Sequence, residues 1–135
     1  MSSKFQIHQF ELTIYPRKLW VVKGGSFKDI ERAFYIEQSE EVEDMLKSCK
    51  AITFRASIKD GDWLGVVVYI KQKMGIKDIA HEALHVSSVV FSDIGVKGDF
   101  YNDEAQAYLV GFAADCINQV VVGLSLIHIS EPTRL

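Results

Sequence analysis

Two long stretches in the second half of the chain carry apolar residues at helical spacing. Between Gly75 and Gly95 the apolar residues fill one arc of a helical projection and the polar residues fill another. This pattern predicts an amphipathic helix bounded by the two glycines. A second helix is predicted from Asn102 to Val120, with Asn102 as the N-cap. The apolar arc of the first helix consists of Ile76, Ile79, Ala80, Ala83, Leu84, Val86, Val90, Phe91 and Ile94.

The first half of the chain shows strand patterns instead. Residues 5–15 and 18–23 are rich in β-branched and aromatic residues and are separated by a proline, so they predict two neighbouring strands. Residues 51–58 and 63–72 predict a second pair, because the Asp-Gly sequence between them favours a tight hairpin turn.

Two further segments lie between these pairs of strands. Ser26 and Asp29 have the spacing of a capping box and predict a short helix that ends near Phe34. Residues 37–50 are acidic with apolar residues at helical spacing, and both a surface helix and an ordered loop stay open for them. Together the elements predict one α+β domain over residues 1–123, with a small, mostly antiparallel sheet packed on the first long helix.

The composition excludes several classes of function. A chain of 135 residues, 48% hydrophobic and 24% charged, suits one domain. The formal net charge of −3 and the scattered basic residues argue against nucleic-acid binding. No apolar run reaches the roughly 18 residues that a membrane span needs, and the start has no signal-peptide pattern, so we expect a cytoplasmic protein. Cys49 and Cys116 are expected to be reduced, buried thiols.

The first long helix carries an HExxH sequence, His81-Glu82-Ala83-Leu84-His85. Helical residues four apart lie one above the other, so both imidazoles leave the same face and can bind one metal ion, for which zinc is expected. Glu82 lies at the flank of this face, where it can act as a general base without binding the metal. The alternative is that the three side chains share a solvated helix face without a metal.

A hydrolytic zinc site uses three protein ligands and keeps one position open for water. Glu104, in the first turn of the second helix, is the candidate for the third ligand. We therefore expect one zinc ion per chain, held by His81, His85 and Glu104. The alternative is that Asp103 and Glu104 only favour the positive end of the helix dipole.

This set of residues resembles the zincin metallopeptidases, and specifically the glutamate-ligand (gluzincin) branch that includes thermolysin. In that branch HExxH lies on one helix and a glutamate ligand lies on a following helix. The residues that carry the resemblance are His81, Glu82, His85 and the segment 102–108, and it covers about residues 63–122. The resemblance implies a minimal zincin-like domain and a zinc-dependent metallopeptidase that acts on a peptide or protein.

Two shorter patterns are similar to small zinc peptidases encoded by bacteria, phages and prophages. These are the Glu-x-x-Ala pattern at Glu104 and Ala107, and the Tyr-Pro-Arg-Lys sequence at residues 15–18. The similarity implies that the protein acts in the cytoplasm of a bacterium or of a phage-infected host cell.

The chain departs from the thermolysin pattern one turn after the third ligand. Where that family places an Asp to orient a histidine, this sequence has Tyr108, which leaves Asp78, Asp115 or a backbone carbonyl for that role. Tyr108 and Tyr101 are candidates for a catalytic donor that stabilises the oxyanion. The alternative is that both tyrosines are packing residues.

In zincins the strand before the HExxH helix lies at the edge of the sheet above the cleft. The resemblance therefore places residues 63–72 at an edge, where an extended peptide can add as another strand. Asp62, Trp63 and Gly65 are then candidates for substrate binding. A position in the core is the alternative for Trp63.

Two other functions stay open. The first is a catalytically silent zincin-fold binding or structural module of a phage or mobile element, and the second is a metal-dependent hydrolase of a bond other than a peptide. An intact Glu82 favours an enzyme, because a binding module does not need this carboxylate. The sequence predicts no oligomeric state.

The last twelve residues form a separate segment. Residues 124–134 resemble the translated sequence of a transposase adapter used for DNA sequencing libraries. We therefore expect residues 124–135 to be non-native and the natural reading frame to be cut after about Gly123. His128 is excluded as a ligand for this reason.

Overall fold

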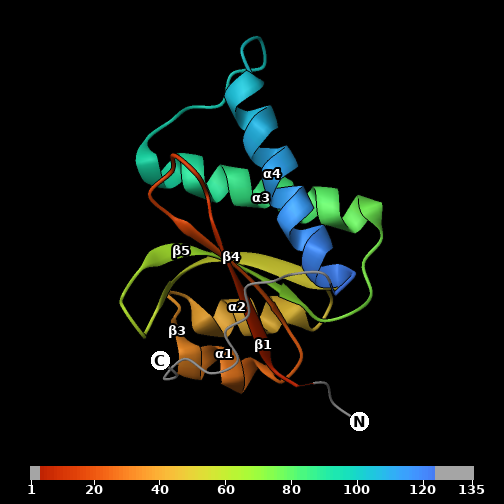
Figure 1. Ribbon diagram of the computed structural model, residues 1–135. Helices are drawn as coiled ribbons and strands as arrows, with labels where there is room; N and C mark the ends of the chain where they lie inside the picture. The colour runs from red at the N-terminus through yellow and green to blue at the C-terminus, as the bar shows by residue number, and fades with distance from the viewer. Residues whose placement is uncertain (1–3, 124–135) are drawn as a thin grey trace.

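The strands pair into one mixed sheet with the order β1-β2-β5-β4-β3. The computed structural model describes residues 4–123 (Figure 1). Neighbouring strands are antiparallel except β2 and β5, which are parallel. The sheet is therefore mostly antiparallel, as predicted. Its strands are β1 (Gln6–Glu11), β2 (Lys18–Lys23), β3 (Phe34–Tyr35), β4 (Ala51–Ile58) and β5 (Leu64–Ile70).

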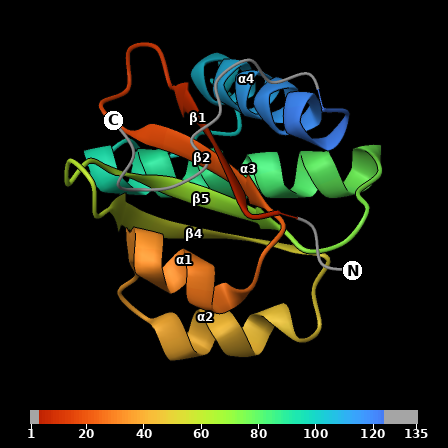
Figure 2. The ribbon, with the colours of Figure 1, turned by 60° about the horizontal axis from the view of Figure 1, so that its bottom comes forward.

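Helices cover both faces of the sheet (Figure 2). The two short helices lie on one face, and the two long helices pack together on the other. This arrangement confirms the α+β class. The helices are α1 (Phe27–Ala33), α2 (Ser39–Leu46), α3 (Ile76–Ile94) and α4 (Glu104–Val121).

The local signals predicted most of the element boundaries. The capping box at the start of α1 is present, because Asp29 Oδ2 accepts a hydrogen bond from the Ser26 backbone N–H at 2.8 Å. Residues 37–50, for which two alternatives stayed open, contain the helix α2. The N-cap of α4 is Asp103, so the assignment of Asn102 is wrong by one residue.

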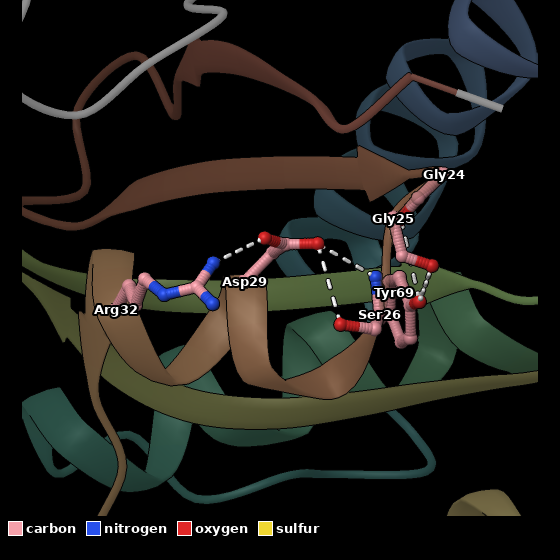
Figure 3. A network of polar contacts seen from close by, with 6 residues as sticks. All are labelled: Gly24, Gly25, Ser26, Asp29, Arg32 and Tyr69. Atoms are coloured by element: carbon pink, nitrogen blue, oxygen red, sulfur yellow. Dashed lines mark hydrogen bonds and ion pairs between the residues drawn. The ribbon is translucent and has the colours of Figure 1, made fainter. Parts of the chain in front are cut away.

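A polar network joins the start of α1 to the end of β2 (Figure 3). The Tyr69 hydroxyl donates to the carbonyls of Gly24 and Gly25 at 3.4 and 3.5 Å, and Arg32 pairs with Asp29 at 2.6 Å. Burial raises the pKa of Tyr69, and the negative charge of Asp29 raises this pKa further. The network fixes α1 against the face of the sheet opposite to α3.

β4 shows how the sheet separates two cores. Its residues alternate between faces, so Ala51 packs toward α3 and α4 whereas Ile52 and Phe54 pack toward α1 and α2. Cys116 lies in the core beside α3, and burial raises the pKa of its thiol to about 12. Cys49 is half-buried, and both cysteines are free.

The predicted position of residues 63–72 at the edge of the sheet is wrong. β5 lies in the centre and pairs along its length with β2 on one side and β4 on the other. The open edge next to α3 belongs to β4, since β3 pairs only with Ser57 and Ile58 and no described strand pairs with the outer side of residues 51–56.

Two further expectations concern the ends of the chain and the membrane. The segment predicted to be non-native, residues 124–135, lies outside the described residues. Within residues 4–123, none of the helices combines the length and the apolar character that crossing a bilayer requires.

Candidate metal centre

α3 carries the HExxH sequence and begins and ends where the sequence predicts. The Gly75 N–H donates to Asp78 Oδ2 at 2.9 Å, and Gly95 closes the helix in the left-handed conformation with φ of 78°. The buried stripe differs from the predicted arc, because Ile76, Ala80 and Leu84 are exposed. The residues that are buried are Ile79, Glu82, Ala83, Val86, Ser87, Val90 and Phe91.

The two histidines lie side by side on the exposed surface of α3. Their Nε2 atoms are 3.2 Å apart, and the ring centroids are 4.7 Å apart with the rings nearly perpendicular. Two imidazole nitrogens that bind one tetrahedral zinc ion at about 2.05 Å lie about 3.3 Å apart. The separation in this chain therefore fits a zinc ion shared by His81 and His85, and it also fits a direct hydrogen bond between the two rings.

Glu82, unlike the two exposed histidines, is buried and only 7% exposed. Thr53 on β4 donates its hydroxyl hydrogen to Glu82 Oε1 at 2.7 Å. No hydrogen bond from residues 4–123 reaches Oε2. One carboxylate oxygen is thus held by the sheet, and Glu82 lines the same pocket as the two imidazoles.

Thr53 is not among the site residues that the sequence predicts, although its hydroxyl contacts Glu82. The alternation of β4 places Thr53 on the same face as Ala51, which is the face toward α3, and this signal was available. The identity of its hydrogen-bond partner could not be predicted, because 29 residues separate Thr53 from Glu82.

Removal of the Thr53 hydroxyl is expected to destabilise the fold. In Thr53→Val a nearly buried carboxylate loses its hydroxyl donor, which costs about 1–3 kcal/mol of the free energy of unfolding. Urea denaturation near neutral pH measures this loss. Thr53→Ser keeps the hydroxyl and serves as the control, and equal stability of the Val and Ser variants would contradict the role of the hydrogen bond.

A pocket of about 500 Å³ lies beside these groups, between α2, the start of β4 and α3. Asp78 lies on its wall. The Gly75 N–H lowers the pKa of Asp78, and the Lys50 ammonium, 3.6 Å away, lowers it further. The lining residues are Met45, Cys49, Lys50, Ala51, Ile52, Thr53, Lys77, Asp78, His81, Glu82 and His85.

Glu104 is the first residue of α4 and is exposed. α4 contacts α3 near this end, where Gln106 Nε2 donates to Ser87 Oγ at 3.2 Å. Within residues 4–123 no three side chains of His, Cys, Asp or Glu lie together as a metal-binding group. The described arrangement thus brings His81 and His85 together, with Glu82 lining the same pocket, and Glu104 as the third ligand stays a prediction.

Tyr101, Tyr108 and Asp115 are not among the residues that line the pocket. Tyr108 is exposed on α4 and lines a separate apolar hollow with Ile14 and Phe112, and Tyr101 is fully exposed. The Asp115 carboxylate accepts a hydrogen bond from Gln119 at 3.4 Å. Of the two carboxylates predicted to orient a histidine, Asp78 is the one that lines the pocket.

Trp63 and Gly65 flank the start of β5, away from the pocket. Trp63 is 59% exposed, with the Lys18 ammonium 4.5 Å from its ring centroid, so the alternative that it belongs to the core is wrong. Gly65 is a packing position, because a Cβ at this residue would lie 2.1 Å from the Lys18 carbonyl oxygen. Asp62 adopts a positive φ of 55° in the turn before the strand.

No protein-family model matches this chain, and no curated protein and no solved structure is significantly similar to it.

Proposed function

We propose that this protein is a zinc-dependent metallopeptidase with a minimal zincin-like domain. His81 and His85 would hold the metal, Glu104 would complete the ligand set, and Glu82 would act as general base. The observation that carries the proposal is the pair of Nε2 atoms 3.2 Å apart in the same pocket as a buried carboxylate that is held through one oxygen only.

A bound zinc ion supplies a water of lowered pKa, near 7, and polarises the carbonyl of the bond to be broken. The residues of the chain supply the positioning and the proton transfer. Thr53 fixes Glu82 through Oε1, which leaves Oε2 to accept the proton of the attacking water and to deliver it to the leaving amine. Because Glu82 is nearly buried, its carboxylate has few other orientations to adopt.

The open edge of β4 supports a peptide as the substrate. Residues 51–53 of this edge line the same pocket as His81 and Glu82. An extended peptide that pairs with the edge is held by backbone hydrogen bonds, which demand little of its sequence. Exposed strand edges are usually covered or blocked in proteins, so an open edge beside a catalytic group is consistent with a substrate-binding role.

A peptide-binding module without catalytic activity is the second candidate. It is favoured by the same open edge together with the fact that, within residues 4–123, no third ligand is assembled beside the histidines. In such a module of a phage or mobile element, zinc would serve stability alone.

Cleavage of a proteome-derived peptide library distinguishes the two candidates. The purified chain with one equivalent of zinc is incubated with the library, with and without a chelator, and new termini are identified by mass spectrometry. The peptidase proposal predicts new termini that disappear with the chelator. Binding of peptides without any new termini would favour the module.

A further inference from the structure

The candidate pocket extends around the open edge of β4 to both faces of the sheet. On one face it is lined by the α3 side chains that include His81 and Glu82. On the other face it is lined by Met45 and Cys49, which belong to α2 and to the turn after it. A strand added at this edge would therefore meet the catalytic groups on one face and α2 on the other.

Met45 is an apolar side chain exposed on this second face. It is 56% exposed, whereas Val42 and Leu46 of the same helix are buried against the sheet. The half-buried Cys49, which follows the end of α2, also lines this pocket. Methionine is unbranched and polarisable, so it adapts its shape to apolar partners of different size.

We infer that Met45 and Cys49 form a specificity subsite for an apolar side chain of an extended peptide substrate. Successive side chains of a β-strand point to opposite faces of the sheet. When one substrate residue faces His81 and Glu82, the residues before and after it face α2, where Met45 covers one of them. This inference rests on the proposed function and adds a substrate class, peptides with Leu, Ile, Met or Phe next to a residue on the α3 face.

The charges of the pocket are balanced among its own side chains. Lys50 forms an ion pair with Asp78 at 3.6 Å, and the charge of Lys77 on the same pocket wall also acts on the Asp78 carboxyl. The open strand edge and the apolar Met45 therefore define the occupant, which is an extended peptide segment with an apolar side chain.

The test uses zinc-loaded Glu82→Gln, which can bind peptides without cleaving them, and an array of random end-blocked decapeptides. We expect the peptides that bind to share an apolar residue at one position. Met45→Lys in this background should weaken binding of those peptides about 10-fold and turn the preference at that position to Asp and Glu. Lysine has nearly the helix propensity of methionine, so α2 should keep its fold. The matched control is Ile14→Lys, an exposed apolar position outside the pocket, which should change nothing.

Cleavage by the otherwise wild-type chain is measured in parallel with the same peptides. An apolar preference that Met45→Lys leaves unchanged would overturn the subsite while cleavage still supported the peptidase. A Met45-dependent preference without cleavage would support the subsite and contradict the peptidase. The absence of both binding and cleavage would overturn both inferences.

Discussion

Glu82→Gln is expected to reduce peptide cleavage by about 10²- to 10⁴-fold while the zinc content stays unchanged. Glutamine keeps the shape of the side chain, and its amide oxygen can still accept the hydrogen bond that Thr53 donates to Oε1. It cannot accept a proton, so only the acid-base step is lost. Initial rates on a peptide identified from the library, with zinc measured by elemental analysis in both proteins, test the prediction.

The control for this substitution is Glu40→Gln, which neutralises an exposed carboxylate on α2 and should leave the rate unchanged. Equal cleavage by wild type and Glu82→Gln would mean that another group, or a contaminating protease, carries the activity. A loss of zinc in Glu82→Gln would assign Glu82 to metal binding and would contradict its role as a base.

His85→Ala is expected to weaken zinc binding by more than about 100-fold. Substitution of a residue that only hydrogen-bonds to a metal ligand already lowers metal affinity roughly 10- to 100-fold, and removal of a ligand lowers it more. The pair of Nε2 atoms 3.2 Å apart cannot be replaced by any other described pair of histidines in the pocket. Competition titration with a chromophoric zinc chelator measures the affinity, and Glu104→Gln in the same titration tests the proposed third ligand.

Ser88→Ala, a change at another exposed position of α3, is the matched control and should keep the affinity of the wild type. If His85→Ala binds zinc as tightly as the wild type, the two imidazoles form a hydrogen-bonded pair rather than a metal site. If Glu104→Gln binds zinc as tightly as the wild type while His85→Ala does not, the third ligand is not Glu104.

The sequence predicted α3 and the position of the HExxH residues because both depend on local rules. The glycines at 75 and 95 bound the helix, and spacing by four residues places His81 and His85 together on one surface. The burial of Glu82 and the exposure of Leu84 depend instead on how far the helix is rotated against the sheet. The spacing of the apolar residues alone predicts the buried face of the helix only to within a broad arc.

The order of the strands depends on contacts far apart in the sequence. β2 pairs with β5 in parallel across more than forty residues, for example Trp20 with Val67, and this pairing puts β5 in the centre. The edge beside the helix then falls to β4, and Thr53 of β4 becomes the partner of Glu82. Turn signals and alternation identify the four longer strands, but not the short strand β3, and they do not specify which strand takes the edge.

The geometry of the candidate third ligand could not be predicted either. Glu104 was identified from its place in the first turn of a helix, and the start of that helix is confirmed within one residue. Its distance from the imidazoles depends on the crossing of α3 and α4, which is fixed by side-chain packing such as the contact of Gln106 with Ser87.

X-ray absorption at the zinc edge of the purified, zinc-loaded chain tests the metal centre most directly. The proposed metal centre predicts one tightly bound zinc ion per chain, with two imidazole nitrogens at about 2.0 Å and the remaining ligands oxygen. It also predicts that one imidazole signal disappears in His85→Ala. A spectrum without imidazole ligands, or one that is the same in His85→Ala, would contradict it.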